Sequence, residues 1–544
     1  MDFSSPARAL LSLDRRRPAL PEDVLDISKP MFNAYTKLTS GTTMTTTEEE
    51  TSKLTQEYLQ GVYALLSKTT TTSSSTTNMR WEALAVALFC GTGLLEGQTR
   101  MADATATTQD AAHKASTDDS SRTTVTPNSV YIDGPRVPSS TASHPATALM
   151  TNGSTSVSTA AAANVNLVKL SSTQTMELAT ILHQTTMEHL EHKEPRIRTL
   201  VARAVGAHAA YLVYLQKNSN GGNNPHVQKL QEQVTALHDR VVASIQEHMQ
   251  QGQQVPDTNG TVIASGSNEE EVVPAGQAKM EDDESAAGDS ENDNDTPTPK
   301  SVVLDDTTGW RALETNWQSL ACLCQPLGGL YFELFPLMEG KLLSQCQSSA
   351  VDHINRHVRA AAMLVLEQWV RSAAQIPSGR KIHPLLIQTV TAVLKDGLAD
   401  NWSQVRMAAS VLCRAFFLEY LSVHPNPEPE AMYAVLIPRM CLNRFYLAQG
   451  VKLYSHDSWR QVFKENGLEL VAKNVGPVCR YYVKMCDANN HVVREGACQA
   501  VAELATKLSA HSPETLQPYV PMLLQALLMC FHDESWPVRK ILVC

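Results

Sequence analysis

The sequence contains no apolar run long enough to cross a membrane. The longest candidate, ALAVALFCGTGLL from Ala83, is interrupted by two glycines, whereas a membrane span needs about 18 consecutive apolar residues. The N-terminus also lacks the apolar segment of a secretory signal, since acidic residues and proline lie among its arginines. We therefore expect a cytoplasmic protein, with the nucleus as the alternative location, and no membrane partner.

Aromatic residues are few, at 6% of the 544 residues, although apolar residues make up 43%. Ala, Leu and Val supply most of the apolar content, and this composition is typical of helices packed on helices. The eleven cysteines are scattered singly and do not form the regular framework of a disulfide-rich protein. They indicate buried thiols in a reducing compartment.

Positive charge is not in excess. The net charge is −11, and residues 268–295 contribute −10 of it through eleven acidic residues and one lysine. Because the rest of the chain is close to neutral, we expect no nucleic-acid groove. No glycine-rich phosphate loop, nucleophile elbow or kinase signature is present either. We therefore predict that the protein is not an enzyme and that it has no catalytic residue, no cofactor and no small-molecule partner.

A phrase recurs from residue 305 to the end. It consists of an acidic residue, a short polar turn, an apolar residue followed by a basic one, and an Ala-rich apolar helix, as in DHINRHVRAAAMLVL from Asp352. The basic residues follow one another at intervals of 48, 47, 46, 42 and 45. The acidic positions are Asp305, Asp352, Asp400, Asp487 and Asp533, and the basic positions are Arg311, Arg359, Arg406, Lys452, Arg494 and Arg539.

A second apolar helix pattern precedes each turn, as in HPLLIQTVTAVLKDGL from His383. Each repeat is thus predicted to be helix A, a tight turn and helix B. The phrases resemble the HEAT-repeat superfamily, whose consensus has Asp and Val-Arg at the turn within the repeat and often a Pro in helix A; Pro384, Pro438 and Pro521 occupy such places. The resemblance, and a period within the range of HEAT and armadillo arrays, imply an all-α, right-handed α-solenoid with long disordered insertions.

The turn residues have a structural interpretation. Asn355, Asn490, Ser535 and either Asn401 or Ser403 lie where a side chain can cap the free N–H groups of helix B. Each basic residue can reach the Asp of its own or the neighbouring turn, which predicts a ladder of charged hydrogen bonds along one edge of the solenoid. We prefer this structural role to a role in ligand contact, because almost every repeat has a basic residue at this position.

The N-terminal half contains the same pattern with insertions. A complete hairpin begins at Ser171, with Glu191 seven residues before Arg198. The helix over 225–249 is either helix A of a repeat whose helix B begins near Trp310 or a dimerising coiled coil of about three heptads; we favour the first. The expected organisation is a disordered N-terminus at 1–46, a divergent hairpin at 47–99, a disordered insertion at 100–165, HEAT-like helices at 166–249, a disordered acidic insertion at 250–304, and the HEAT array at 305–544.

The last repeat is short. DESWPVR from Asp533 is expected to continue into a helix of about fifteen residues, as the earlier repeats do, but only five residues follow Arg539. Arrays of this kind normally end in a polar capping repeat. We therefore expect a fragment, a truncated gene model or an alternative end.

Two cysteines and two histidines are candidate metal ligands. His353 and His357 are four residues apart, but the pattern has no third ligand, and Cys322 and Cys324 have no second pair. We predict no metal site.

Three features could instead bind other proteins. Trp402 and Trp536 lie in turns, as do tryptophans of the tubulin-binding TOG domains, and the acidic insertion resembles the acidic loop of importin-β-like transport receptors. The third feature is the concave face, which helices B line in a HEAT stack. We predict a protein-binding scaffold or adaptor that uses the concave face, with a transport receptor and a tubulin-binding protein as the alternatives.

Overall fold

The computed structural model describes residues 48–70, 84–99, 170–219, 224–251, 309–336 and 340–541. Within these ranges every regular element is helical and there is no strand. The segments expected to be disordered lie outside the described residues, except for residues 250 and 251, which end a helix. No helix of the described part is both long and apolar enough to span a membrane.

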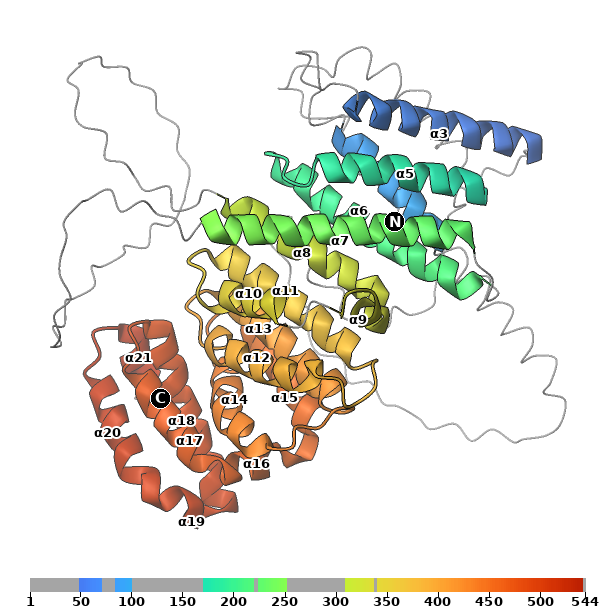
Figure 1. Ribbon diagram of the computed structural model, residues 1–544. Helices are drawn as coiled ribbons and strands as arrows, with labels where there is room; N and C mark the ends of the chain where they lie inside the picture. Colours follow the sequence, from blue (N-terminus) through green and yellow to red (C-terminus); the bar gives the residue numbers. More distant parts are fainter. Residues whose placement is uncertain are drawn as a thin grey trace, which may run out of the picture.

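The helices form consecutive hairpins, each made of an A helix and a B helix (Figure 1). The first consists of α3 (Glu48–Thr70) and a helix over residues 84–99. The next are α5 (Ser172–Glu188) with α6 (Pro195–Asn218), α7 (Pro225–Gln251) with α8 (Trp310–Leu327), α10 (Lys341–Val351) with α11 (Arg356–Ala373), α12 (Ile382–Gly397) with α13 (Ser403–Ala415), α14 (Pro429–Asn443) with α15 (Gln449–Phe463), α17 (Val475–Cys486) with α18 (His491–His511), and α20 (Val520–Phe531) with α21 (Trp536–Ile541). The short helices α9 (Tyr331–Leu334), α16 (Gly467–Lys473) and α19 (Pro513–Leu516) lie in the connections.

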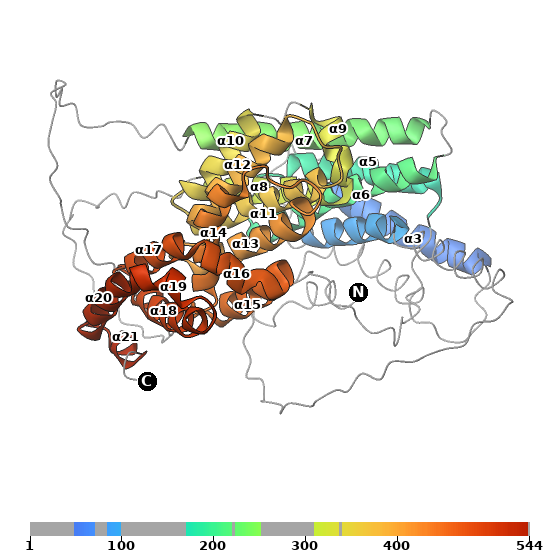
Figure 2. The ribbon, with the colours of Figure 1, turned by 90° about the horizontal axis from the view of Figure 1, so that it is seen from below.

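The hairpins stack in two layers. Helices α10, α12, α14, α17 and α20 pack on one another in that order, and α6, α8, α11, α13 and α15 do the same beside them (Figures 1 and 2). Apolar side chains of both layers form one continuous core, in which Trp317 of α8 and Trp369 of α11 are fully buried. This arrangement confirms the predicted all-α solenoid of HEAT-type hairpins.

Asparagine side chains of the turns cap two B helices. Asn355 Oδ1 accepts a hydrogen bond from the backbone N of His357 at 2.9 Å, and Asn490 Oδ1 accepts one from the backbone N of Val492 at 2.9 Å. Neither Asn401 nor Ser403 caps α13, because its first residue is Ser403 and its N-cap residue is Trp402, which forms no side-chain cap bond. The Asp400 carboxylate instead accepts a bond from the Trp402 backbone N at 2.8 Å.

Helix α7 belongs to the solenoid. It packs against α5, α6 and α8, and its apolar stripe is fully buried by these contacts; the stripe consists of Leu230, Val234, Leu237, Val241 and Ile245. A coiled coil would need the same side chains for a second helix. The apolar face of α7 is therefore not open to a dimer partner, and α7 and α8 form one hairpin on the two sides of residues 252–308.

The stack changes locally after α15. Here α16 is inserted, and α18 packs against α14, α16 and α17. Arg444, at the end of α14, reaches Glu503 of α18 with hydrogen bonds of 3.2 and 2.5 Å. This is the place where the interval between basic residues falls to 42.

Candidate functional site

The arginines of the ladder donate hydrogen bonds to backbone carbonyl oxygens of their own turns. The Arg359 Nη1 donates to the carbonyl oxygens of His353 at 2.7 Å and Ile354 at 2.9 Å. These carbonyls follow the last turn of the A helix and have no helical partner. The same bonds to the arginine's own turn are made by Arg198, Arg406, Arg494 and Arg539.

Two arginines also reach the Asp of the next repeat. Arg359 donates to the Asp400 carboxylate at 2.9 and 3.2 Å, and Arg494 donates to the Asp533 carboxylate at 2.6 and 2.9 Å. The guanidinium of Arg494 lowers the pKa of the Asp533 carboxyl. These paired bonds join consecutive turns along one edge of the stack.

Arg406 has a different partner in the next turn. The position six residues before Lys452 is Tyr446 rather than Asp, and the Arg406 guanidinium lies 4.3 Å from the centre of that ring. Its Nη1 donates to Asn443 Oδ1 at 2.6 Å. Arg406 is only 1% exposed, and this burial lowers its pKa. Carbonyl, amide and aromatic groups thus replace the carboxylate.

Four predicted members stand outside the ladder. Arg311 is exposed and lies over Trp310, at 5.4 Å from the ring centre, and the half-buried Lys452 forms no side-chain hydrogen bond or ion pair with another described residue. Asp352 and Asp487 are exposed and have no arginine partner within the described ranges. Asp305 itself lies outside those ranges. Arg198 belongs to the repeat before Asp305, and it donates to Thr315 Oγ1 at 2.9 Å rather than to an Asp of the next turn.

The two candidate tryptophans are both exposed at the start of a B helix. Trp402 is 50% exposed and Trp536 is 64% exposed. The guanidinium of Arg356 lies 4.1 Å from the centre of the Trp402 ring, and that of Arg539 lies 5.7 Å from the Trp536 ring. The backbone of Trp402 is tied to Asp400, so its ring has a defined place on the surface.

Two further exposed apolar residues lie in the turns on either side of Trp402. Ile354, between α10 and α11, is 69% exposed, and Leu447, between α14 and α15, is 62% exposed. The bonds of Arg359 to Asp400, and of Arg406 to Asn443, hold these turns next to one another. We call Ile354, Trp402 and Leu447 the turn edge. Sequence reasoning missed Ile354 and Leu447, although a large apolar residue in a short polar turn was a usable signal.

The charges beside the turn edge are mainly positive. Arg356 lies over the Trp402 ring, whereas the Asp400 carboxylate is paired with Arg359. Burial lowers the pKa of His353 and of His357, so both are neutral at pH 7. The exposed Asp352 is the acidic exception. The surface therefore suits a partner that combines apolar and acidic groups.

His353 and His357 do not converge on one point. The Nδ1 of His353 accepts a bond from the Asn355 backbone N at 3.0 Å, whereas His357 contacts Gln404 and stacks on Trp310. Cys322 and Cys324 lie in the middle of α8. Neither pair belongs to a potential metal-ligand group among the described residues.

No family model matches the chain, and no curated protein matches its sequence. Comparison with solved structures gives several weak similarities. An engineered protein is 9% identical over 100% of this chain and 97% of its own, with a TM-score of 0.29. Kap121p bound to RanGTP is 11% identical over 99% of this chain and 48% of its own, with a TM-score of 0.32, and Kap121p bound to Pho4p is 12% identical over 100% and 41%, with a TM-score of 0.29. The chain thus spans about half the length of these Kap121p chains, and at these TM-scores the likeness supports no conclusion about this chain.

Proposed function

We propose that the chain is a protein-binding scaffold and that the turn edge is part of its contact surface. The observation that carries this proposal is the half-exposed Trp402, flanked in consecutive turns by the exposed Ile354 and Leu447. Binding hot spots are typically aromatic or arginine side chains in a partly apolar surface. The arginine–turn bonds hold the three side chains in place before binding, so little conformational entropy is lost when a partner docks.

The B-helix face is the second surface that a solenoid offers. Its charged groups are largely paired with one another: Arg371 contacts Glu419, and the Arg414 Nη2 lies 3.0 Å from the Asp457 carboxylate. A partner on this face would have to displace these ion pairs or bind over them. Since the turn edge has free apolar groups and unpaired positive charge, we favour it over the concave face expected from the sequence.

The test is capture of partners by the purified full-length chain from the cells that produce it. The edge variant combines Ile354→Ser, Trp402→Ser and Leu447→Ser. Two control variants each replace one exposed leucine elsewhere, Leu385→Ser on α12 and Leu453→Ser on α15. We expect the edge variant alone to lose specifically retained proteins. Loss of retained proteins in Leu453→Ser alone would show that the contact surface lies on the B helices. An unchanged set of retained proteins in all three variants would contradict the proposal.

A tubulin-binding function is the second candidate, and the exposure of Trp402 beside Arg356 favours it. Purified tubulin is the direct probe: the wild-type chain would co-sediment with it and Trp402→Ala would not. The transport-receptor alternative depends on the acidic insertion at 250–304, nearly all of which lies outside the described residues. For either function we propose the cytoplasm as the place of action.

A further inference from the structure

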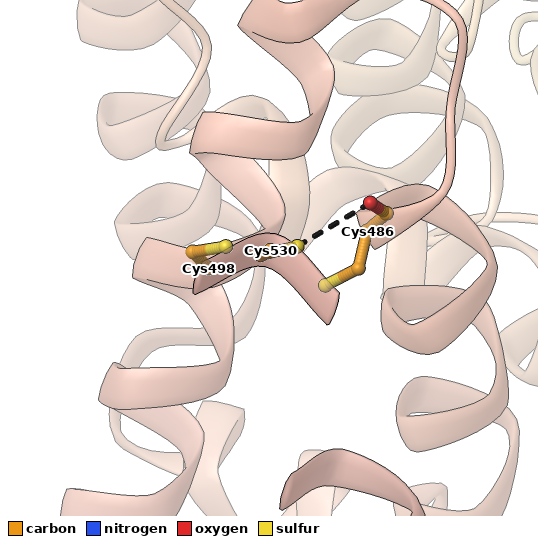
Figure 3. Close-up of side chains that lie close together, drawn as sticks. All are labelled: Cys486, Cys498 and Cys530. Carbon is orange, nitrogen blue, oxygen red and sulfur yellow. Dashed lines mark hydrogen bonds between the residues drawn. The ribbon is translucent and has the colours of Figure 1, made fainter. Parts of the chain in front are cut away.

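Three cysteines from three different helices meet in the core of the C-terminal hairpins (Figure 3). Cys486 ends α17, Cys498 lies in α18, and Cys530 lies near the end of α20. Their sulfur atoms all lie within 4.8 Å of one another. The side chains are 6%, 1% and 2% exposed, respectively.

This cluster differs from the other cysteines of the described chain. A single buried cysteine behaves as a small apolar side chain, and Cys413 of α13 is an example: burial alone raises the pKa of its thiol. In the cluster the thiols instead face one another, and the Cys530 Sγ donates to the carbonyl oxygen of Cys486 at 3.4 Å. Within the described residues it is the one group of three or more potential metal ligands.

The spacing fits a metal ion. Zinc–sulfur bonds are about 2.3 Å long, so sulfurs bound to one zinc lie about 3.8–4.0 Å apart. The 4.8 Å limit of the cluster thus leaves only a small contraction to be made by side-chain rotation. We propose that Cys486, Cys498 and Cys530 bind one thiolate-preferring metal ion, and that this ion is Zn²⁺.

The charge of the site distinguishes Zn²⁺ from Cu⁺. Binding deprotonates three thiols and releases three protons, so the complex has a net charge of −1 with Zn²⁺ and −2 with Cu⁺. A buried site tolerates the smaller charge better. Among the described residues, Arg494 is the cation that interacts with the cluster from a neighbouring turn, and it is already paired with Asp533. No described His, Asp or Glu completes the group, so the three thiolates are the ligands that the described residues supply.

A bound ion would link two repeats. Cys486 and Cys498 belong to the α17–α18 hairpin, whereas Cys530 belongs to the next A helix. The Arg494–Asp533 pair joins the same two repeats at the turn. Zinc would therefore stabilise the stack against separation of its last described hairpins.

The first test needs no substitution. The reduced, metal-free full-length chain is alkylated under native conditions with and without one equivalent of Zn²⁺, and the modified cysteines are identified by mass spectrometry. We expect zinc to protect Cys486, Cys498 and Cys530 together and to leave the alkylation of Cys413 unchanged. Equal labelling of the three with and without zinc, or a disulfide among them in the reduced protein, would overturn the proposal.

The second test measures metal content and affinity. Zinc per chain is determined by elemental mass spectrometry after purification without chelators, and a competing chromophoric chelator gives the dissociation constant. Cys498→Ser should lose one equivalent of zinc and at least a hundredfold in affinity. The matched control is Cys413→Ser, which replaces an equally buried thiol of a B helix and should retain the zinc. Equal zinc content in both variants would contradict the proposal, and a parallel titration with Cu⁺ that binds at one equivalent when Zn²⁺ does not would refute the choice of ion.

Discussion

The Arg359 guanidinium and the Asp400 carboxylate form two hydrogen bonds, at 2.9 and 3.2 Å, between consecutive repeats. Both side chains are largely buried, at 11% and 14% exposure. Arg359 also binds two carbonyls of its own turn, and Asp400 also accepts from the Trp402 backbone N. The pair therefore fixes both turns and the exposed side chains that they hold.

Asp400→Asn should destabilise the protein by about 1–3 kcal/mol, because a buried, charge-assisted hydrogen-bond pair is weakened while the guanidinium remains buried. The free energy of unfolding measured in urea checks this. Asp352→Asn is the matched control, since Asp352 is an exposed turn Asp without an arginine partner, and its effect should be within about 0.5 kcal/mol. Equal effects of the two substitutions would show that the pair contributes nothing.

Arg406→Lys should be costly although it keeps the charge. The Arg406 guanidinium reaches the carbonyl oxygens of Leu398 and Ala399, and also Asn443 Oδ1, and a single ammonium cannot bind all of these groups. We expect the free energy of unfolding to fall by about 3 kcal/mol, which is typical of a buried charge that loses its partners. The exposed Arg311 provides the control, because Arg311→Lys should leave the thermal midpoint unchanged. A similar midpoint for both variants would contradict the role of Arg406.

The stability of the last hairpins should depend on the ionisation of Asp533. Its folded-state pKa is lowered, first by the hydrogen bonds from Arg494, relative to an unfolded value of about 3.9. The stabilisation is therefore present above about pH 4 and is lost as the pH falls through the folded-state pKa. Urea unfolding of the wild type and Asp533→Asn should differ at about pH 6 and converge below about pH 4. A constant difference at both pH values would refute the mechanism.

Gly206→Ala should destabilise the packing of α6 on α8. A Cβ at Gly206 would lie 2.9 Å from the backbone oxygen of Cys322, and a backbone atom cannot rotate away. Overpacking of this kind costs about 1–3 kcal/mol. Gly450 of α15 has open space around its Cβ position, so Gly450→Ala should instead stabilise the helix by about 0.5–1 kcal/mol. Thermal unfolding of the two variants should therefore shift in opposite directions, and shifts of the same sign would contradict the close approach.

Trp402→Ala should separate binding from stability. The ring is half exposed, and its contact with Arg356 is worth about 0.5–1 kcal/mol, so the thermal midpoint should change little. The affinity for a partner captured by the wild-type chain should fall about tenfold or more, as for an aromatic hot spot. Leu385→Ala should change neither quantity. A partner bound equally well by Trp402→Ala would exclude the ring from the contact surface.

Much of the fold was predictable because each packed hairpin repeats the same turn residues and the same spacing of apolar residues in the sequence. Most turns of the array carry a basic residue at the same place, and the intervals between these residues identified the repeats. The heptad-like stripe of α7 was ambiguous at that stage, since the same apolar spacing serves a coiled coil and a solenoid helix. Its contacts with α5, α6 and α8 assign it to the solenoid.

The candidate surface was predictable only in part. Trp402 and Trp536 were identified from the sequence because each lies in a turn just before the apolar–Arg pair, as tryptophans of TOG domains do. Ile354 and Leu447 were missed, although each is a large apolar residue in a short turn; that they lie beside Trp402 depends on how neighbouring turns align. The bonds of Arg406 to Asn443 and its stacking on Tyr446 were not foreseeable either, since the rule of one Asp per turn fails at that repeat.

The sequence by itself determined that this chain is a stack of helical hairpins. The period, the turn residues and the apolar stripes are local features, and each repeat shows them within its own segment of the sequence. Only the tertiary structure decided which side chains from different repeats meet. Cys486, Cys498 and Cys530 are separated by 12 and 32 residues, a spacing that matches no metal-binding pattern, and yet their sulfurs lie within 4.8 Å. The physical reason is that the register between stacked helices is set by the packing of many apolar side chains at once, and that sum cannot be read from any single segment.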